Sequence, residues 1–430
     1  MKFGKWIVIT IAALLLCLPS TVFAGSARGD AVSPALLVLA HKNTMAKSCV
    51  HGEEIGFVAE DFEKALNVSS VASITITELP ERSDGILYLG GSEVTVGQTV
   101  SRANISYLTF AFMNEDISDS AFRFSTNHGD YDISCAVYRL KYENRSPVVS
   151  SVPQEIVSVS TYKGIDVYGN LDAYDPDGDE IRYEIVSYPQ NGSLILLDSE
   201  NGEYQYLPAN GFAGEDTFRY VAVDRYGNYS ASVQVALTVA QPKTAFVYSD
   251  LKESKAHVAA ISLTERGIMA SSELDGCYYF YPETELTRAE FLVMAMKTFG
   301  IRVDSNAEET VFADNGEISR EYRGYVDLAQ KLGYVCGRLD SENQLVFCPN
   351  EKITRYEAAV MLCQMFDADT PVLKPMLMDA EVVPAWAMDA VYAMTAAGIL
   401  TSEEGYVEAD AVVTRAQAAQ MLYKLSIHGE

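Results

Sequence analysis

One four-residue pattern occurs three times in the last third of the chain, each time at the start of an apolar helical run. The copies are Thr287-Arg288-Ala289-Glu290, Thr354-Arg355-Tyr356-Glu357 and Thr414-Arg415-Ala416-Gln417. An aspartate and a second helix-like stretch precede each copy, and these aspartates are Asp250, Asp314 and Asp379. Because a short helical unit cannot bury its apolar face alone, the repeat predicts three units that pack on one another.

The threonine and the acid or amide of each copy have the spacing of a capping box. A threonine at the N-cap accepts a hydrogen bond from the third helical residue, whose Glu or Gln side chain accepts one from the threonine N–H. Gln417 should cap its helix as well as Glu290 and Glu357 cap theirs. These pairs therefore have a structural role that needs no ligand.

Capping does not explain the arginines. Arg288, Arg355 and Arg415 stand at the first helical position, where the positive end of the helix dipole makes a cation slightly unfavourable. One interpretation is a solvated surface arginine. The other is an anion site, because the guanidinium fork matches a carboxylate in two bonds and lies beside free backbone N–H groups.

The repeated pattern resembles the S-layer homology (SLH) domain over residues 246 to 427, as repeats at 246–302, 310–368 and 375–427. The resemblance implies non-covalent binding to an anionic secondary cell-wall polysaccharide, often pyruvylated. It also implies contacts from the arginine, the aspartate and a tryptophan at the start of the first helix. The third repeat has Trp386 at that place, the second has Tyr322 and the first has Ala256. The implied polysaccharide-binding residues are thus Arg288, Arg355, Arg415, Asp250, Asp314, Asp379, Tyr322 and Trp386.

The middle of the chain alternates apolar and polar residues in short runs that Gly, Asn, Asp and Pro turns separate, which predicts a β-sandwich. Its Asp175-Pro176-Asp177-Gly178-Asp179, Asn191-Gly192-Ser193-Leu194 and Phe212 to Phe218 segments resemble the bacterial cadherin-like repeat over residues 147–240. Carboxylates in and around these turns are hard oxygen ligands suited to calcium, although acidic turns with Asx hydrogen bonds would have the same composition. The candidate calcium ligands are Asp175, Asp177, Asp179, Asp216 and Asp224.

Residues 33–143 resemble a diverged cadherin-like or Ig-like copy of the same architecture. Ile74-Thr75-Ile76 and Ser120 to Phe124 parallel strand segments of the cadherin-like region. The Asp-Pro-Asp-Gly-Asp cluster is missing from this copy, so the calcium expectation does not extend to it.

The N-terminal residues 1–24 are expected to be a cleaved secretory signal, with Lys2 and Lys5 before an apolar run and Val22-Phe23-Ala24 as its end. No later stretch is long and apolar enough to span a bilayer. The net charge of −27 argues against nucleic-acid binding. Six cysteines remain after residue 24 and could pair in 15 ways. We expect Cys336–Cys348 to be bridged, and Cys49–Cys135, which bracket the first domain, are the next pair to test.

The predicted architecture is multidomain, with two all-β sandwiches followed by an all-α trio of SLH repeats. The sequence shows no catalytic motif, so we expect a non-enzymatic, secreted protein held on the cell wall or S-layer. We expect no required cofactor, and calcium binding by the acidic turns stays an open alternative. Two alternatives stay open. In the first the β domains are a displayed adhesin for a host, cell or glycan partner, and in the second a wall hydrolase has its site within residues 33–143.

Overall fold

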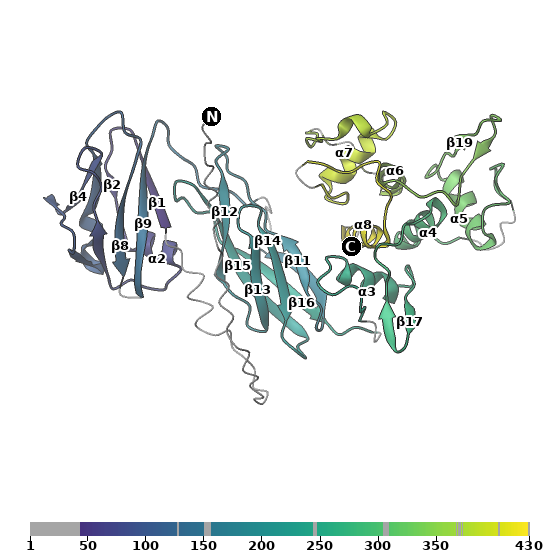
Figure 1. Ribbon diagram of the computed structural model, residues 1–430, viewed down its shortest axis with the longest axis horizontal. Coiled ribbons are helices and arrows are strands. Elements are labelled where there is room, and N and C mark those ends of the chain that lie inside the picture. Colours follow the sequence, from purple (N-terminus) through teal and green to yellow (C-terminus); the bar gives the residue numbers. More distant parts are fainter. Residues whose placement is uncertain are drawn as a thin grey trace, which may run out of the picture. The chain divides into compact units, whose positions relative to one another are not determined.

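The computed structural model describes residues 44–126, 129–149, 156–243, 247–303, 309–366, 368, 371, 373–402 and 405–428. The expected signal sequence lies outside the described residues. Among the described residues, β-strands are the main regular structure as far as Ala240 and helices are the main regular structure after it (Figure 1). In the described part of the chain, no helix has the length and apolar character needed to cross a membrane.

The first β domain has two sheets that enclose an aromatic core. The five-stranded sheet has the order β1-β9-β8-β3-β6 and the four-stranded sheet the order β2-β7-β4-β5. Phe122 packs edge-on against Phe57, with 5.6 Å between the ring centroids, and Phe124 against Phe62, with 5.0 Å. Its elements are β1 (Thr44–Val50), β2 (Ile55–Gly56), α2 (Ala59–Leu66), β3 (Ser73–Glu78), β4 (Gly85–Leu89), β5 (Ser92–Glu93), β6 (Thr99–Ser101), η1 (Arg102–Tyr107), β7 (Leu108–Phe112), β8 (Asp119–Thr126) and β9 (Gly129–Leu140).

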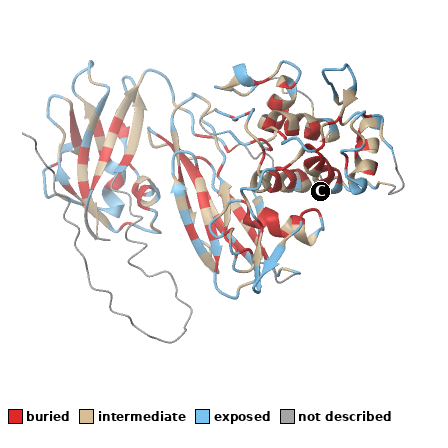
Figure 2. Ribbon diagram, turned by 45° about the vertical axis from the view of Figure 1, so that its right-hand side comes forward, coloured by how far each residue is buried: buried red, intermediate tan, exposed pale blue. Residues whose placement is uncertain are grey.

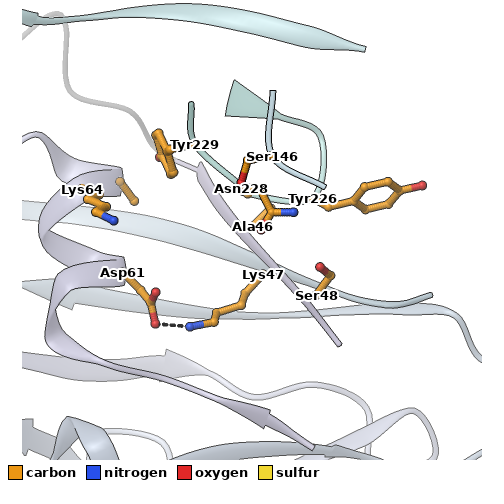
Figure 3. Close-up of a pocket in the computed structure, with 11 residues that line it drawn as sticks. Ala46, Lys47, Ser48, Asp61, Lys64, Ser146, Tyr226, Asn228 and Tyr229 are labelled. Carbon is orange, nitrogen blue, oxygen red and sulfur yellow. Dashed lines mark hydrogen bonds and ion pairs between the residues drawn. The ribbon is translucent and has the colours of Figure 1, made fainter. Parts of the chain in front are cut away.

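Helix α2 is fixed to this domain by its acidic first turn. Asp61 accepts a hydrogen bond from the Val58 N–H at 2.8 Å, so it caps the helix. The same carboxylate forms an ion pair with Lys47 of β1 (Figure 3). The buried face of α2 presents Phe62, Ala65 and Leu66 to the core.

The second β domain is also a two-sheet sandwich. One sheet has the order β10-β16-β15-β12 and the other β11-β14-β13. Alternate residues of β16 are buried, as expected for a strand with one face on a core. Its strands are β10 (Ile156–Tyr162), β11 (Val167–Asn170), β12 (Ile181–Ser187), β13 (Gly192–Asp198), β14 (Glu203–Pro208), β15 (Gly214–Asp224) and β16 (Val233–Ala240).

The larger sheets of the two β domains have four strands in the same order, to which the first domain adds β6. In each, the first strand pairs in parallel with the last, β1 with β9 and β10 with β16. The next two neighbours also correspond, because β8 and β3 occupy the places of β15 and β12. The chief difference lies between the second and third strands, where the first domain has helix α2 and the second has the Asp175–Asp179 turn.

The C-terminal part consists of three helical units, which we name by order: the first unit is 247–303, the second 309–366 and the third 373–428. The first two units each contain two helices joined through a β-hairpin, and the third has α7 and α8 without a described hairpin. Their elements are α3 (His257–Glu265), β17 (Ser272–Leu274), β18 (Cys277–Tyr279) and α4 (Arg288–Thr298); α5 (Arg320–Lys331), β19 (Arg338–Leu339), β20 (Leu345–Val346) and α6 (Arg355–Phe366); and η2 (Ala380–Val382), α7 (Met388–Ala396) and α8 (Arg415–His428).

One continuous apolar core joins the three units. It contains Phe291 and Leu292 of α4, Leu362 of α6 and Leu422 of α8, all at most 1% exposed. Figure 2 shows that buried residues are concentrated in the helices of this part of the chain. The units therefore fold as a single helical domain, in agreement with the expectation that no unit can bury its apolar face alone.

The cysteine expectation is corrected by the structure, in which neither Cys49 and Cys135 nor Cys336 and Cys348 form a disulfide. In the parallel β1–β9 ladder, Cys135 lies opposite Met45, whereas Cys49 lies opposite Arg139, four positions further along. Four residues of strand extend about 13 Å, much more than a disulfide can bridge. Cys336 and Cys348 flank the β19–β20 hairpin as expected, but they are not bonded to each other.

Candidate functional site

A closed ring of backbone hydrogen bonds lies where the three units meet. The residue before each repeated threonine donates to its counterpart in another unit: Leu286 to Val413, Val413 to Ile353, and Ile353 to Leu286, at 2.9–3.1 Å between N and O. These three bonds form a cycle, so the units are arranged with approximate threefold symmetry. Each unit consequently has one junction with each of its neighbours.

The three repeated arginines cross these junctions. The Nε of Arg288 donates to the carbonyl of Phe347 at 3.1 Å, that of Arg355 to Val407 at 2.7 Å, and that of Arg415 to Phe280 at 2.8 Å. We name the contacts the first junction (Arg288 into the second unit), the second junction (Arg355 into the third) and the third junction (Arg415 into the first). Arg288 is 8% exposed and Arg355 is 4% exposed, so the expectation of a solvated surface arginine is wrong for both.

The aspartates hold the segments that receive the arginines. Asp250 accepts from the N–H groups of Phe280 and Tyr281, Asp314 from those of Phe347 and Cys348, and Asp379 from that of Val407. In each unit the same residue donates its N–H to the aspartate and offers its carbonyl to the arginine of the neighbouring unit. The aspartate and arginine therefore act together on one peptide segment, a relation that sequence spacing alone did not reveal.

All three capping boxes are confirmed. The threonine N–H donates to Glu290 at 2.9 Å, to Glu357 at 3.0 Å and to the amide oxygen of Gln417 at 3.0 Å. Gln417 thus caps α8 as Glu290 caps α4.

The first junction contains an ion pair that the sequence did not predict. Nη1 of Arg288 donates to Oε1 of Glu357 at 2.7 Å, and the two side chains are 10% and 14% exposed. Oε2 of Glu357 meanwhile accepts from the Thr354 N–H. The capping glutamate therefore has a second role, which is to neutralise the arginine of the preceding unit.

The arginines differ in their electrostatic surroundings. Burial lowers the pKa of Arg415, and the nearby Tyr248, Glu290 and Asp250 oppose that shift. Burial also lowers the pKa of Arg355, opposed by Glu408 and Asp379. At the third junction, Glu290 caps the helix of the receiving unit and is one of the charges that oppose the lowering of the Arg415 pKa. At the second junction the corresponding capping residue is Gln417, which is neutral.

The predicted sugar platform lies at the second junction. Trp386 is 65% exposed, and its ring meets the ring of Tyr356 edge-on with 5.6 Å between centroids. Tyr322, its counterpart in the second unit, is half-buried, and burial raises its pKa with help from Glu321 and Glu290. Tyr356 belongs to the second copy of the repeated pattern, Thr354-Arg355-Tyr356-Glu357. Its contact with Trp386 was not predicted from the sequence.

The second β domain contains the predicted acidic cluster. Candidate ligand oxygens of Asp175, Asp177 and Asp179 lie within 4.8 Å of one another. Oδ1 of Asp175 accepts from the Asp177 N–H at 2.8 Å, whereas its Oδ2 is buried without a hydrogen-bond partner in the described structure. Burial raises the pKa of Asp179, and the charges of Asp175, Asp224 and Asp177 add to the shift. A buried unpaired carboxylate oxygen among repelling carboxylates fits a hard cation.

Arg145 supplies the positive charge at this cluster. Its Nε donates to Asp177 at 2.8 Å, and this contact holds the pKa of the Asp177 carboxyl below its usual range. The arginine compensates one carboxylate and leaves the Asp175 Oδ2 unpaired.

Two further candidate calcium ligands have other roles. Asp216 accepts four hydrogen bonds at 2.8–3.0 Å, from the N–H groups of Gln190, Asn191 and Thr217 and from the Tyr206 hydroxyl. It fastens the turn before β13 to strand β15. Asp224 is 1% exposed and accepts from the N–H groups of Tyr226 and Asn228 and from the Asn144 amide. Neither belongs to the group of three carboxylates whose oxygens converge.

Two segments of the chain match known protein families. Residues 144–241 match the bacterial cadherin-like domain, and residues 379–419 match the S-layer homology domain. The second match lies in the third helical unit and ends within α8, and it indicates association with the cell surface. These segments correspond to two of the regions expected from the sequence.

The chain is also 27% identical over 251 residues to exoglucanase XynX of Acetivibrio thermocellus. The aligned region is 55% of this chain but 21% of that protein. Among solved structures, the fibronectin(III)-like modules of Clostridium thermocellum CbhA share 14% identity, over 48% of this chain and 95% of that one, with a TM-score of 0.21. Drosophila N-cadherin EC1-3 shares 14% identity, over 47% and 68%, with a TM-score of 0.21. With TM-scores of 0.21, these two structures give no information on the role of this chain.

Proposed function

We propose that this protein is a secreted surface protein held non-covalently on an anionic secondary cell-wall polysaccharide by three SLH repeats, the three helical units. The observation that supports the proposal is the cyclic arrangement in which all three units use an arginine and an aspartate at corresponding positions and a capping residue that is Glu in two units and Gln in the third. A segment that matches the SLH family lies in the third unit. The first and second units have the same contacts at the same positions, which extends the assignment to them.

The binding surface proposed is the set of junctions between units. Each junction brings an arginine and an aspartate-held peptide into one place, and the guanidinium is the group that favours an anionic ligand. The expected free N–H groups at the helix N-termini are not available, because those of the first two helical residues donate to carbonyls of the adjoining segments. At the second junction an exposed tryptophan adds a ring face on which a sugar can pack. A pyruvyl ketal, which carries a carboxylate on a sugar, has both of the required chemical features.

The two β domains are proposed to be outward structural modules, and calcium is proposed to strengthen the second. Asp175, Asp177 and Asp179 would hold the ion, which would supply the positive charge that the buried Asp175 oxygen lacks. Catalysis is not part of the proposal. The similarity to an exoglucanase covers a fifth of that protein, so hydrolysis of wall glycans by the full chain is an assay to run beside the binding test.

Sedimentation with purified cell wall tests the proposal. The full chain should pellet with walls and remain in solution without them. Trp386→Ala should weaken binding with little loss of stability, since the ring is 65% exposed. Tyr142→Ala, which removes an aromatic ring that is 82% exposed outside the helical units, is the matched control and should bind like wild type. Failure of the wild-type chain to pellet with walls would refute the proposal.

A further inference from the structure

We infer that the second β domain pairs with a second copy of this chain through the free edge of β13, so that its three-stranded sheet continues into that of the other copy. The inference goes beyond the proposed anchoring and does not depend on it. It rests on the backbone of β13, on the side chains that this edge exposes and on the position of its charge.

β13 is the last strand of its sheet. Among the described residues it pairs with β14 and with no other strand, in the order β11-β14-β13 (Figure 1). A free edge offers unpaired N–H and C=O groups to another chain, and proteins usually guard it with charges, proline or a very short strand. β13 has seven residues, and none from Gly192 to Leu197 is charged or proline. A bulge interrupts its ladder with β14 only after Leu196.

The register of the sheet shows which backbone groups face this edge. The N–H of Ala209 donates to the carbonyl of Asn191, which lies opposite it, at 2.8 Å. Hydrogen-bonded and non-hydrogen-bonded pairs alternate along an antiparallel ladder. The backbone groups of Gly192, Leu194 and Leu196 therefore point away from β14, and each of these residues presents a donor and an acceptor to the free edge.

A second copy, antiparallel and related by a twofold axis at Leu194, satisfies all of these groups. Gly192 then lies opposite Leu196 of the other copy, and Leu194 lies opposite its own counterpart. Both pairs are of the hydrogen-bonded kind. The start of the strand is already held in place, because Asp216 accepts a hydrogen bond from the Asn191 N–H at 2.8 Å. The edge therefore needs little ordering before it pairs.

The outer face of this edge is apolar. Ile195 is 54% exposed, and Leu207, its diagonal neighbour on β14, is 46% exposed. In the inferred register Ile195 lies opposite Ser193 of the other copy, which in turn lies beside Leu207 of that copy. Apolar side chains of both copies would thus meet across the seam, where cross-strand neighbours stabilise a sheet.

The other seven-residue edge strands of this domain are less suited to pairing. β12 carries Arg182 and Glu184. The exposed residues of β10 are Ile156, Ser158 and Ser160, so that two of the three are hydroxyl side chains. The apolar exposed face distinguishes β13 from both.

Electrostatic repulsion is small at this seam. The net charge of −27 opposes self-association in general. The charged residue of β13 is Asp198, at the end of the strand. With the axis at Leu194, the two Asp198 residues would be about 27 Å apart along the paired strands. The Debye length at physiological salt is about 8 Å, so these charges are screened from each other.

Sedimentation equilibrium of the chain from residue 25 onward tests the inference. A range of about 1 to 500 µM is suitable, because a small interface is weak. Wild type should pass from monomer to dimer. Ile195→Lys should lower the association constant about tenfold or more, since it places like charges from both copies at the seam. Ile156→Lys is the matched control, an isoleucine that is 49% exposed on the edge of the opposite sheet, and should associate like wild type.

Hydrogen exchange of the wild-type chain locates the contact. The amides of Gly192, Leu194 and Leu196 should exchange more slowly at the highest concentration than at the lowest. The inference is overturned if wild type stays monomeric over the whole range, if Ile195→Lys associates as strongly, if Ile156→Lys loses as much, or if the three amides exchange equally fast at both concentrations. Sedimentation with cell wall tests the anchoring separately, so failure of one leaves the other standing.

Discussion

The Arg288–Glu357 pair should be a major determinant of the stability of the helical domain. Both side chains are nearly buried, at 10% and 14% exposure. Arg288→Met would leave the Glu357 carboxylate without its cation and the Phe347 carbonyl without its donor. Removing one member of a buried pair costs about 3 to 5 kcal/mol. The methionine keeps much of the apolar stem, so most of this loss would come from the unpaired charge.

A double-mutant cycle isolates that contribution. Glu357→Gln retains the cap and removes the charge, and the double variant Arg288→Met/Glu357→Gln contains neither ion. We expect the double variant to be more stable than the sum of the single losses predicts, by about 2 kcal/mol. Arg355→Met is the matched comparison and should cost less than Arg288→Met, because the described hydrogen bonds of Arg355 go to backbone carbonyls and not to a carboxylate.

Urea unfolding of the chain from residue 25 onward, in which Trp386 is the only tryptophan of the sequence, gives the free energies when it is followed by fluorescence. The single remaining tryptophan lies in the third helical unit, so the signal reports on the helical domain and not on the β domains. Single losses that add to within about 0.5 kcal/mol in the double variant would refute the argument that the two charges depend on each other.

Three further predictions concern the second β domain and the third helical unit. Millimolar calcium should raise the melting temperature of the second β domain by binding the native state, and Asp175→Asn should abolish that shift; calorimetry with and without chelator checks it, and an unchanged transition in wild type would count against calcium. Because the pKa of Asp179 is raised, its ionised form costs stability above that pKa, so Asp179→Asn should raise the calcium-free melting temperature at pH 7. Thr414→Ala should destabilise the helical domain by about 1 kcal/mol through loss of its cap, measured by urea unfolding, and should leave wall binding by the folded protein intact.

Local features of this protein were determined by the sequence itself. The capping boxes at Thr287, Thr354 and Thr414 form between residues three apart, so the pattern of side chains was enough to predict them. The β-sandwich of the middle region followed from alternating apolar residues and turn motifs in the same way. The converging carboxylates of Asp175, Asp177 and Asp179 are also neighbours in the chain.

Contacts between distant segments were decided by the tertiary structure. Arg415 reaches a carbonyl 135 residues earlier in the chain, and nothing in its own repeat indicates that partner. The burial of the arginines, the second role of Glu357 and the removal of Asp216 from the acidic cluster all arise when separate elements close on one another. Short-range spacing fixes which residues cap and turn, because the helix and strand periods are local. Which charges meet depends on how the ring of three units closes, and only the folded chain brings those groups together.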